Sequence, residues 1–169
     1  EKGEKVDNGY LFNGLKIAEC GEEIMQHQQQ YPVIFMTLKS AKQPTYEMAH
    51  GALTDEIYNE FMRHRYVLQS DALLPIEKER YENLLNRRAD EKEVAKAFAF
   101  LSECLFKYHG KKTIILIDEY DVPLENAYFE GFYDKMIKFI RSLFESALKT
   151  NPYLERSVIT GCLRISKES

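Results

Sequence analysis

The segment Thr113–Asp118 constrains the fold of this chain more than any other part of the sequence. Its centre is four consecutive aliphatic residues, and it ends in the adjacent carboxylates Asp118 and Glu119. An unbroken aliphatic run is typical of a strand covered on both faces, as strands of parallel sheets are. Open α/β sheets bind ligands just beyond the carboxyl ends of their strands. The segment therefore predicts a parallel sheet with a polar site at that end.

Composition places the chain among ordinary soluble globular proteins. Its 169 residues are enough for one α/β domain with a sizeable core. Hydrophobic residues make up 44% and charged residues 30%, and the 11 Tyr and 10 Phe argue against disorder. The net charge of -4 argues against a general nucleic-acid-binding surface. No apolar stretch approaches membrane-spanning length, so we expect no membrane partner.

The cysteines indicate a reducing compartment. Cys20, Cys104 and Cys162 are odd in number and far apart, and the chain has no Cys-x-x-Cys pair. The four histidines show no zinc spacing, and no signal peptide is visible. We therefore expect reduced thiols in a cytoplasmic protein.

Hydrophobic periodicity predicts alternating strands and helices. Strands are expected at 33–38, 113–117 and 157–160, and helices at 45–68, from 75 onward, at 90–109 and at 132–149. This order favours a parallel sheet with right-handed crossover helices. Residues 1–30 are polar and are expected to form a loose or linking segment.

Asp118 and Glu119 have the form of a Walker B segment, the strand end that serves P-loop nucleotide hydrolases. In phosphoryl transfer an Asp at a strand end anchors magnesium. A neighbouring Glu can orient and deprotonate the attacking water. The alternative is a buried strand that ends in a solvated acidic turn. Asp121 is either a supporting carboxylate or a residue of the turn before Pro123, and the turn is the simpler interpretation.

A second candidate segment follows the last predicted strand. Thr160 ends that strand, where its hydroxyl could contact water or phosphate, and Arg164 and Lys167 could bind phosphate. An ordinary strand-to-loop transition with solvated basic residues explains the same residues. No Gly-x-x-x-x-Gly-Lys-Ser/Thr loop occurs in the chain, so half of a phosphate-transfer site is absent from these residues.

Three motifs together resemble the bacterial AAA-ATPase-like family. They are Tyr31–Phe35 with Leu38-Lys39, then Leu116-Ile117-Asp118-Glu119-Tyr120-Asp121-x-Pro123, then Thr160-Gly161-x-x-Arg164-Ile165-x-Lys167-Glu168-Ser169. The segment Gly131–Ile137 resembles the helix that follows Walker B in that family. The motifs occur in the family's order and span nearly the whole chain.

The resemblance implies a partial P-loop NTPase-like three-layer α/β fold, with ATP and Mg2+ as ligands. It assigns Asp118 to the metal, Glu119 to water activation, and Thr160 and Arg164 to a sensor-like, nucleotide-binding position, with Arg164 also contributing to catalysis. Residues 1–169 are then the central part of one ATPase domain, cut at both ends. The P-loop is expected upstream, and a restriction-endonuclease-like nuclease domain downstream, through which alone nucleic acid would be bound.

Several expectations follow for this chain. Without a P-loop, the chain alone should lack ATPase activity. The strand at 157–160 should be an exposed edge that permits self-association. Two alternative functions remain: a non-catalytic binding or scaffold module that keeps the ATPase fold, and a metal-dependent nuclease that uses Asp118, Glu119 and Asp121.

Overall fold

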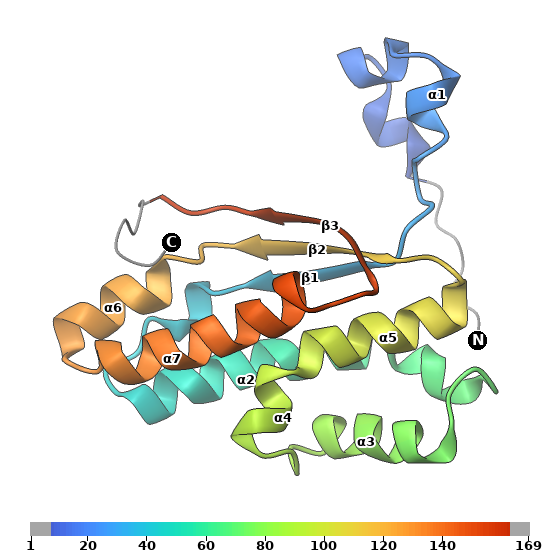
Figure 1. Cartoon of the computed structure of the whole chain (residues 1–169). Coiled ribbons are helices and arrows are strands. Elements are labelled where there is room, and N and C mark those ends of the chain that lie inside the picture. Colours follow the sequence, from blue (N-terminus) through green and yellow to red (C-terminus); the bar gives the residue numbers. More distant parts are fainter. Residues whose placement is uncertain (1–7, 163–169) are drawn as a thin grey trace.

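The computed structural model of the chain describes residues 8–162. Three strands form one parallel sheet in the order β1-β2-β3 (Figure 1). They are β1 (Val33–Thr37), β2 (Thr113–Asp118) and β3 (Leu154–Ile159), and β2 pairs in parallel with both neighbours. Helices make the crossover connections. The predicted α/β class is confirmed, and the architecture is consistent with a partial P-loop-like fold.

The helices are, in chain order, α1 (Glu22–Met25), α2 (Tyr46–Arg63), α3 (Pro75–Leu85), α4 (Glu91–Ala95), α5 (Ala97–His109), α6 (Val122–Glu130) and α7 (Tyr133–Phe144). Short 3-10 turns lie at Gly9–Phe12, Lys16–Glu19, Lys39–Ala41 and Arg65–Gln69, and a π-helical turn at Glu145–Lys149. Thr45 caps α2 by accepting the Met48 N–H, and Asp90 caps α4 by accepting the Glu93 N–H.

Several element boundaries differ from the sequence-based expectation. The helix expected at 90–109 is interrupted at Lys96, which separates α4 from α5. The strand expected at 157–160 begins earlier, at Leu154, and ends at Ile159. The sequence predicts a turn after Asp121, but α6 begins there. Pro123 signals a turn, yet proline also fits the first turn of a helix, where its missing N–H is not needed.

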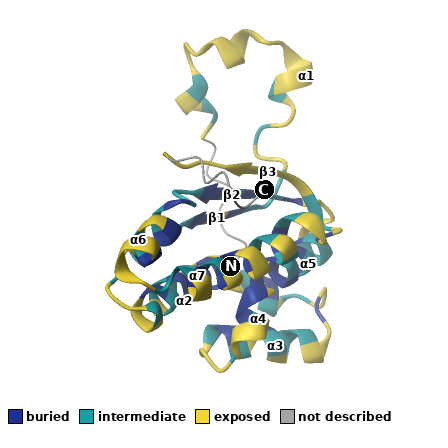
Figure 2. Cartoon of the chain, turned by 60° about the vertical axis from the view of Figure 1, so that its left-hand side comes forward, coloured by how far each residue is buried: buried dark blue, intermediate teal, exposed yellow. Residues whose placement is uncertain are grey.

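Helices α2, α5 and α7 cover one face of the sheet (Figure 1). Along β2 this face carries Ile115 and Ile117, which are fully buried. The opposite face is more open. There Phe35, Leu116 and Val158 are in register across the three strands, and Phe35 and Val158 are 47% and 53% exposed. The sheet therefore has one closed and one partly open face. In Figure 2 the helical layer lies on one side of the sheet, and β3 is coloured mostly as exposed.

A buried polar network fixes the starts of β2 and β3. The Ser102 hydroxyl, on α5, accepts hydrogen bonds from the Thr113 hydroxyl and from the Asn151 amide, each at 3.0 Å. The Thr113 N–H donates to the Tyr153 carbonyl at 2.8 Å. Because each buried polar group is satisfied by a specific partner, the network holds β3 in one position beside β2.

Side chains from α2 close the outer edge of β1. The Phe35 N–H donates to the Glu60 carboxylate at 2.8 Å. Arg63 donates to Glu60 and also to the Val33 carbonyl, and His64 Nε2 lies 3.1 Å from the same carbonyl. Edge groups that would otherwise attract another strand are thus occupied by side chains.

Glu60 stays ionised although it is 5% exposed. Burial alone would raise the pKa of its carboxyl group. Hydrogen bonds from His64, Arg63 and the Phe35 amide outweigh that effect and hold the pKa below its usual value. A carboxyl whose pKa is lower in the folded state stabilises that state above its unfolded-state pKa. The stabilisation is lost as the pH falls through the lower, folded-state pKa.

The outer edge of β3 is not closed in this way. The Thr160 N–H donates to Ile117 and the Thr160 carbonyl accepts from Tyr120, so the backbone groups of Thr160 face β2. Alternation along the strand then turns the N–H groups of Ser157 and Ile159 outward. No strand pairs with them among residues 8–162.

Residues 8–30 stand apart from the helical layer, on the far side of the sheet (Figures 1 and 2). Most of their side chains are exposed, including Tyr10, Leu11 and Ile24. Within the part of the chain that the structure describes, no helix is both long and apolar enough to cross a membrane.

We predict that Glu60→Gln lowers the free energy of unfolding by about 2 kcal/mol at neutral pH, the usual scale for hydrogen bonds to a charged group. Chemical denaturation across a pH series measures this. The difference from wild type should begin to shrink as the pH falls below the pKa of glutamate in the unfolded chain, and it should be lost once the pH passes the lower, folded-state pKa. Glu79→Gln, on the exposed side of α3, is the control and should match wild type. A pH-independent difference would contradict the charged role of Glu60.

We also predict that the chain self-associates through the β3 edge as its concentration rises. Light scattering over a concentration series measures this. Ser157→Pro removes one outward N–H and should reduce association, whereas Ser157→Ala should not. A monomer at all concentrations, with the Ser157 and Ile159 amides strongly protected from hydrogen exchange, would show that the edge is covered.

Candidate functional site

The carboxyl ends of the three strands bring Thr37, Asp118 and Thr160 to the same end of the sheet. Thr37 and Asp118 are the last residues of β1 and β2 and are in register. Thr160 follows β3 directly, and its N–H donates to the Ile117 carbonyl at 2.9 Å. Parallel pairing therefore places three polar side chains where α/β sheets bind ligands.

Asp118 and Thr160, which lie far apart in the sequence, are in direct contact. The Thr160 hydroxyl donates to Asp118 Oδ1, and the Glu119 N–H donates to the same oxygen at 2.9 Å. No residue within 8–162 donates to Asp118 Oδ2. The carboxylate is half-buried, and its Oδ1 is oriented by these two neighbours.

Glu119 has an unusual backbone conformation. Its φ angle is +56°, in the left-handed region that non-glycine residues seldom adopt. This conformation costs about 1 kcal/mol for a residue with a side chain. The Glu119 carbonyl accepts the Val122 N–H at 3.2 Å, so the turn leads directly into α6. Residues held in such conformations cluster at functional sites.

Asp121 joins the ends of β2 and β3. It is 2% exposed, and its Oδ2 accepts the Cys162 N–H at 2.9 Å. Sequence reasoning left Asp121 as a turn residue or a supporting carboxylate, and the structure places it immediately before α6. The sequence signal is the proline two positions later, which favours a helix start. The contact with Cys162 has no local signal because 41 residues separate the two.

Gly161 is required by the close approach of these two strand ends. A Cβ atom at this position would lie 2.6 Å from Asp121 Oδ1 and 2.7 Å from the Tyr120 ring. Both distances are shorter than van der Waals contact allows, so only glycine lets Thr160 and Cys162 flank this point without displacement.

One predicted residue cannot be placed. Arg164, expected at the nucleotide and in catalysis, lies outside the described residues. Thr37, in contrast, is an addition, since sequence reasoning did not single it out. Its hydroxyl accepts the Lys39 N–H at 3.4 Å, and a polar residue that ends a buried strand was the available signal.

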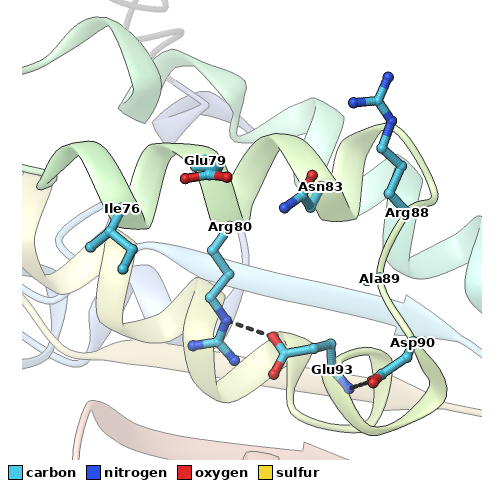
Figure 3. A pocket seen from close by; sticks show the side chains of 8 residues that line it. All are labelled: Ile76, Glu79, Arg80, Asn83, Arg88, Ala89, Asp90 and Glu93. Carbon is cyan, nitrogen blue, oxygen red and sulfur yellow. Dashed lines mark hydrogen bonds and ion pairs between the residues drawn. The ribbon is translucent and has the colours of Figure 1, made fainter.

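A separate pocket lies between α3 and α4 and contains none of the predicted site residues (Figure 3). Its volume is about 450 Å³, and its lining includes Arg80, Arg88, Asp90 and Glu93. Arg80 Nε lies 2.7 Å from Glu93 Oε2, and the Arg80 guanidinium also stacks on the Phe100 ring. Because the charges of Arg80 and Glu93 pair with each other, we interpret this pocket as a feature of the fold and not as a ligand site.

The donor set at the strand ends suits a metal that is only partly held by protein. Among residues 8–162, no group of three or more His, Cys, Asp or Glu side chains is placed to hold an ion. Magnesium commonly uses one or two carboxylates, with water and substrate phosphates completing its shell. Asp118, whose Oδ2 accepts from no residue between 8 and 162, fits that requirement.

The three-stranded parallel α/β sheet is consistent with a partial P-loop-like fold. The family model described as "Predicted AAA-ATPase" matches residues 1–169. The chain therefore belongs to the AAA-ATPase-like family. Searches of curated proteins and of solved structures both gave no match.

We predict that Gly161→Ala destabilises the ends of β2 and β3, because the added Cβ would displace Asp121 or Tyr120. Thermal unfolding should show a loss of about 1–3 kcal/mol, the usual cost of overpacking. The control is Gly51→Ala within α2, where no atom lies within 4 Å of the added Cβ. That change should stabilise the helix by about 1 kcal/mol. Equal stability of Gly161→Ala and wild type would contradict the close approach.

Proposed function

We propose that this chain carries the magnesium-binding and water-activating part of an ATP-hydrolysing site at the carboxyl ends of β2 and β3. The observation that supports this most is the contact between Asp118 and Thr160, with Glu119 beside them in a left-handed conformation. Family membership supports the ATPase theme. The arrangement matches what phosphoryl transfer needs from protein, which is mainly positioning and electrostatics.

Asp118 is the proposed metal ligand. Its Oδ1 is held by the Thr160 hydroxyl and the Glu119 amide. Oδ2 is the oxygen that we propose binds the metal. When bound, magnesium supplies positive charge that neutralises the phosphate oxygens. Thr160, at the end of the neighbouring strand, would then keep the Asp118 carboxylate in one orientation.

Glu119 is the proposed general base. It follows the proposed metal ligand directly in the chain, and its backbone has the left-handed conformation, with a φ angle of +56°. A carboxylate at this point can accept a proton from a water beside the terminal phosphate. Arg164 is the proposed cation for phosphate charge, as the family resemblance implies.

The phosphate-binding loop of such a site is not encoded in these 169 residues. We therefore propose that the chain is the central part of one ATPase domain and that ATP turnover requires a P-loop supplied elsewhere in a longer protein. Lys and backbone amides of that loop provide most phosphate contacts in this class.

We prefer ATP hydrolysis over a metal-dependent nuclease because Asp121 is committed to another role. Its carboxylate is buried and accepts the Cys162 N–H, so it ties two strands together. A non-catalytic module that keeps the fold is the remaining alternative. The two functions predict different effects on ATP hydrolysis when Glu119 is replaced.

We predict that, in a longer protein that joins this chain to a P-loop, Glu119→Gln lowers ATP hydrolysis by about a hundredfold or more. That is the usual scale for losing a general base. ATP binding should change little, because glutamine preserves the shape of the side chain. Asp118→Ala should also weaken the magnesium-dependent part of nucleotide binding. Phosphate release and calorimetric binding of ATP with and without magnesium measure these effects.

Two comparisons make the outcome decisive. Glu125→Gln lies on the exposed surface of α6 and should leave both binding and turnover unchanged. The 169-residue chain alone should release phosphate at background rate. Full activity of Glu119→Gln would reassign Glu119 to a structural turn and favour the non-catalytic module.

A further inference from the structure

The outer surface of α6 displays two large aromatic side chains. Tyr128 is 70% exposed and Phe129 is 76% exposed. Their ring centroids are 5.7 Å apart in an edge-to-face arrangement. With the exposed carboxylates Glu125 and Glu130 of the same helix, they form a surface that we call the α6 patch.

The α6 patch is presented by a well-supported helix. Leu124 and Ala127 are buried on the opposite side of α6. Asn126 Nδ2 donates to the Gln43 carbonyl at 2.6 Å, which ties α6 to the loop that follows β1. Gly131 ends the helix in a left-handed conformation, and its N–H donates to Ala127. The two aromatic rings are therefore exposed from an ordered helix and not from a frayed end.

The patch is also acidic. Neither Glu125 nor Glu130 forms an ion pair with any residue from 8 to 162. Glu130 is the last residue of α6, where the helix dipole disfavours a negative charge. From 118 to 134 the chain has no Lys or Arg and carries the carboxylates Asp118, Glu119, Asp121, Glu125, Glu130 and Asp134.

The nearest cation in the sequence does not neutralise this charge. Lys135 lies 4.0 Å from Glu47 and 5.5 Å from the centre of the Tyr46 ring, so it is directed toward α2. Within the part of the chain that the structure describes, the patch thus combines apolar contact area with negative charge that no ion pair offsets.

We propose that the α6 patch binds a basic segment of a partner protein, one that carries Lys or Arg beside aliphatic or aromatic side chains. Exposed aromatic residues on a rigid element are frequent binding hot spots. The two carboxylates add electrostatic complementarity to a cationic partner and repel nucleic acid and other anions. A twofold contact between two copies of the patch would bring like charges together, so a symmetric dimer through this patch does not fit.

The proposal goes beyond ATP hydrolysis and stands without it, because none of its evidence depends on Asp118 or Glu119 acting on a nucleotide. Helix α6 nevertheless connects the α6 patch to the candidate site at the strand ends. α6 begins directly after Asp121, which is fixed to the end of β3. A partner on the patch would sit on the element that leads away from the candidate site.

Fluorescence anisotropy with a labelled peptide tests the proposal on the chain itself. The probe is an amphipathic helical peptide of leucine and lysine, and the matched control replaces every lysine with glutamate. Wild type should bind the lysine peptide and not the glutamate peptide. Tyr128→Ser combined with Phe129→Ser should weaken binding about tenfold or more, the scale of losing hot-spot residues.

Two further variants separate the contributions. Glu125→Gln combined with Glu130→Gln should weaken binding and reduce its dependence on salt, since screened charge pairs are lost. Tyr10→Ser combined with Leu11→Ser removes exposed apolar side chains elsewhere and should bind like wild type. Circular dichroism verifies that each variant is folded. Unchanged binding after loss of both α6 aromatic residues, or failure of wild type to prefer the lysine peptide, would overturn the proposal.

Discussion

The parallel register of β2 between β1 and β3 is the constraint on which the rest of the structure depends. Because all three strands run in the same direction, their last residues meet at one end of the sheet, and residues 42 positions apart come into contact there. The helices must then cross from one end of the sheet to the other, which places them in a layer against it. The same register aligns the apolar side chains that form the core.

The two edges of the sheet differ in whether side chains bind their outward backbone groups. The β1 edge is occupied by Glu60, Arg63 and His64, whose side chains bind backbone groups that another strand would otherwise use. Within residues 8–162, no strand pairs with the outward groups of β3. A strand added to the described sheet would therefore pair at β3, next to Thr160 and the candidate site.

The sequence predicts those parts of the structure that depend on patterns among residues close together in the chain. The aliphatic run 114–117 predicts a strand, and the four-residue spacing of Ala49, Leu53, Ile57 and Phe61 predicts α2, because both patterns arise from neighbours in the chain. Contacts across the sheet are not predictable in this way. The roles of Glu60, Asp121 and Gly161 depend on partners brought together only by folding. α6 is missed because Pro123 is compatible with both a turn and a helix start.

The left-handed conformation of Glu119 lowers the stability of the fold at the same position that carries the proposed catalytic carboxylate. Glycine would adopt the same backbone angles without steric cost, so the fold by itself favours glycine there. Glycine, however, has no carboxylate. Glu119 therefore carries a carboxylate at the cost of backbone strain. Replacement by glycine would remove the strain and the carboxylate together, so stability and the proposed hydrolysis should change in opposite directions.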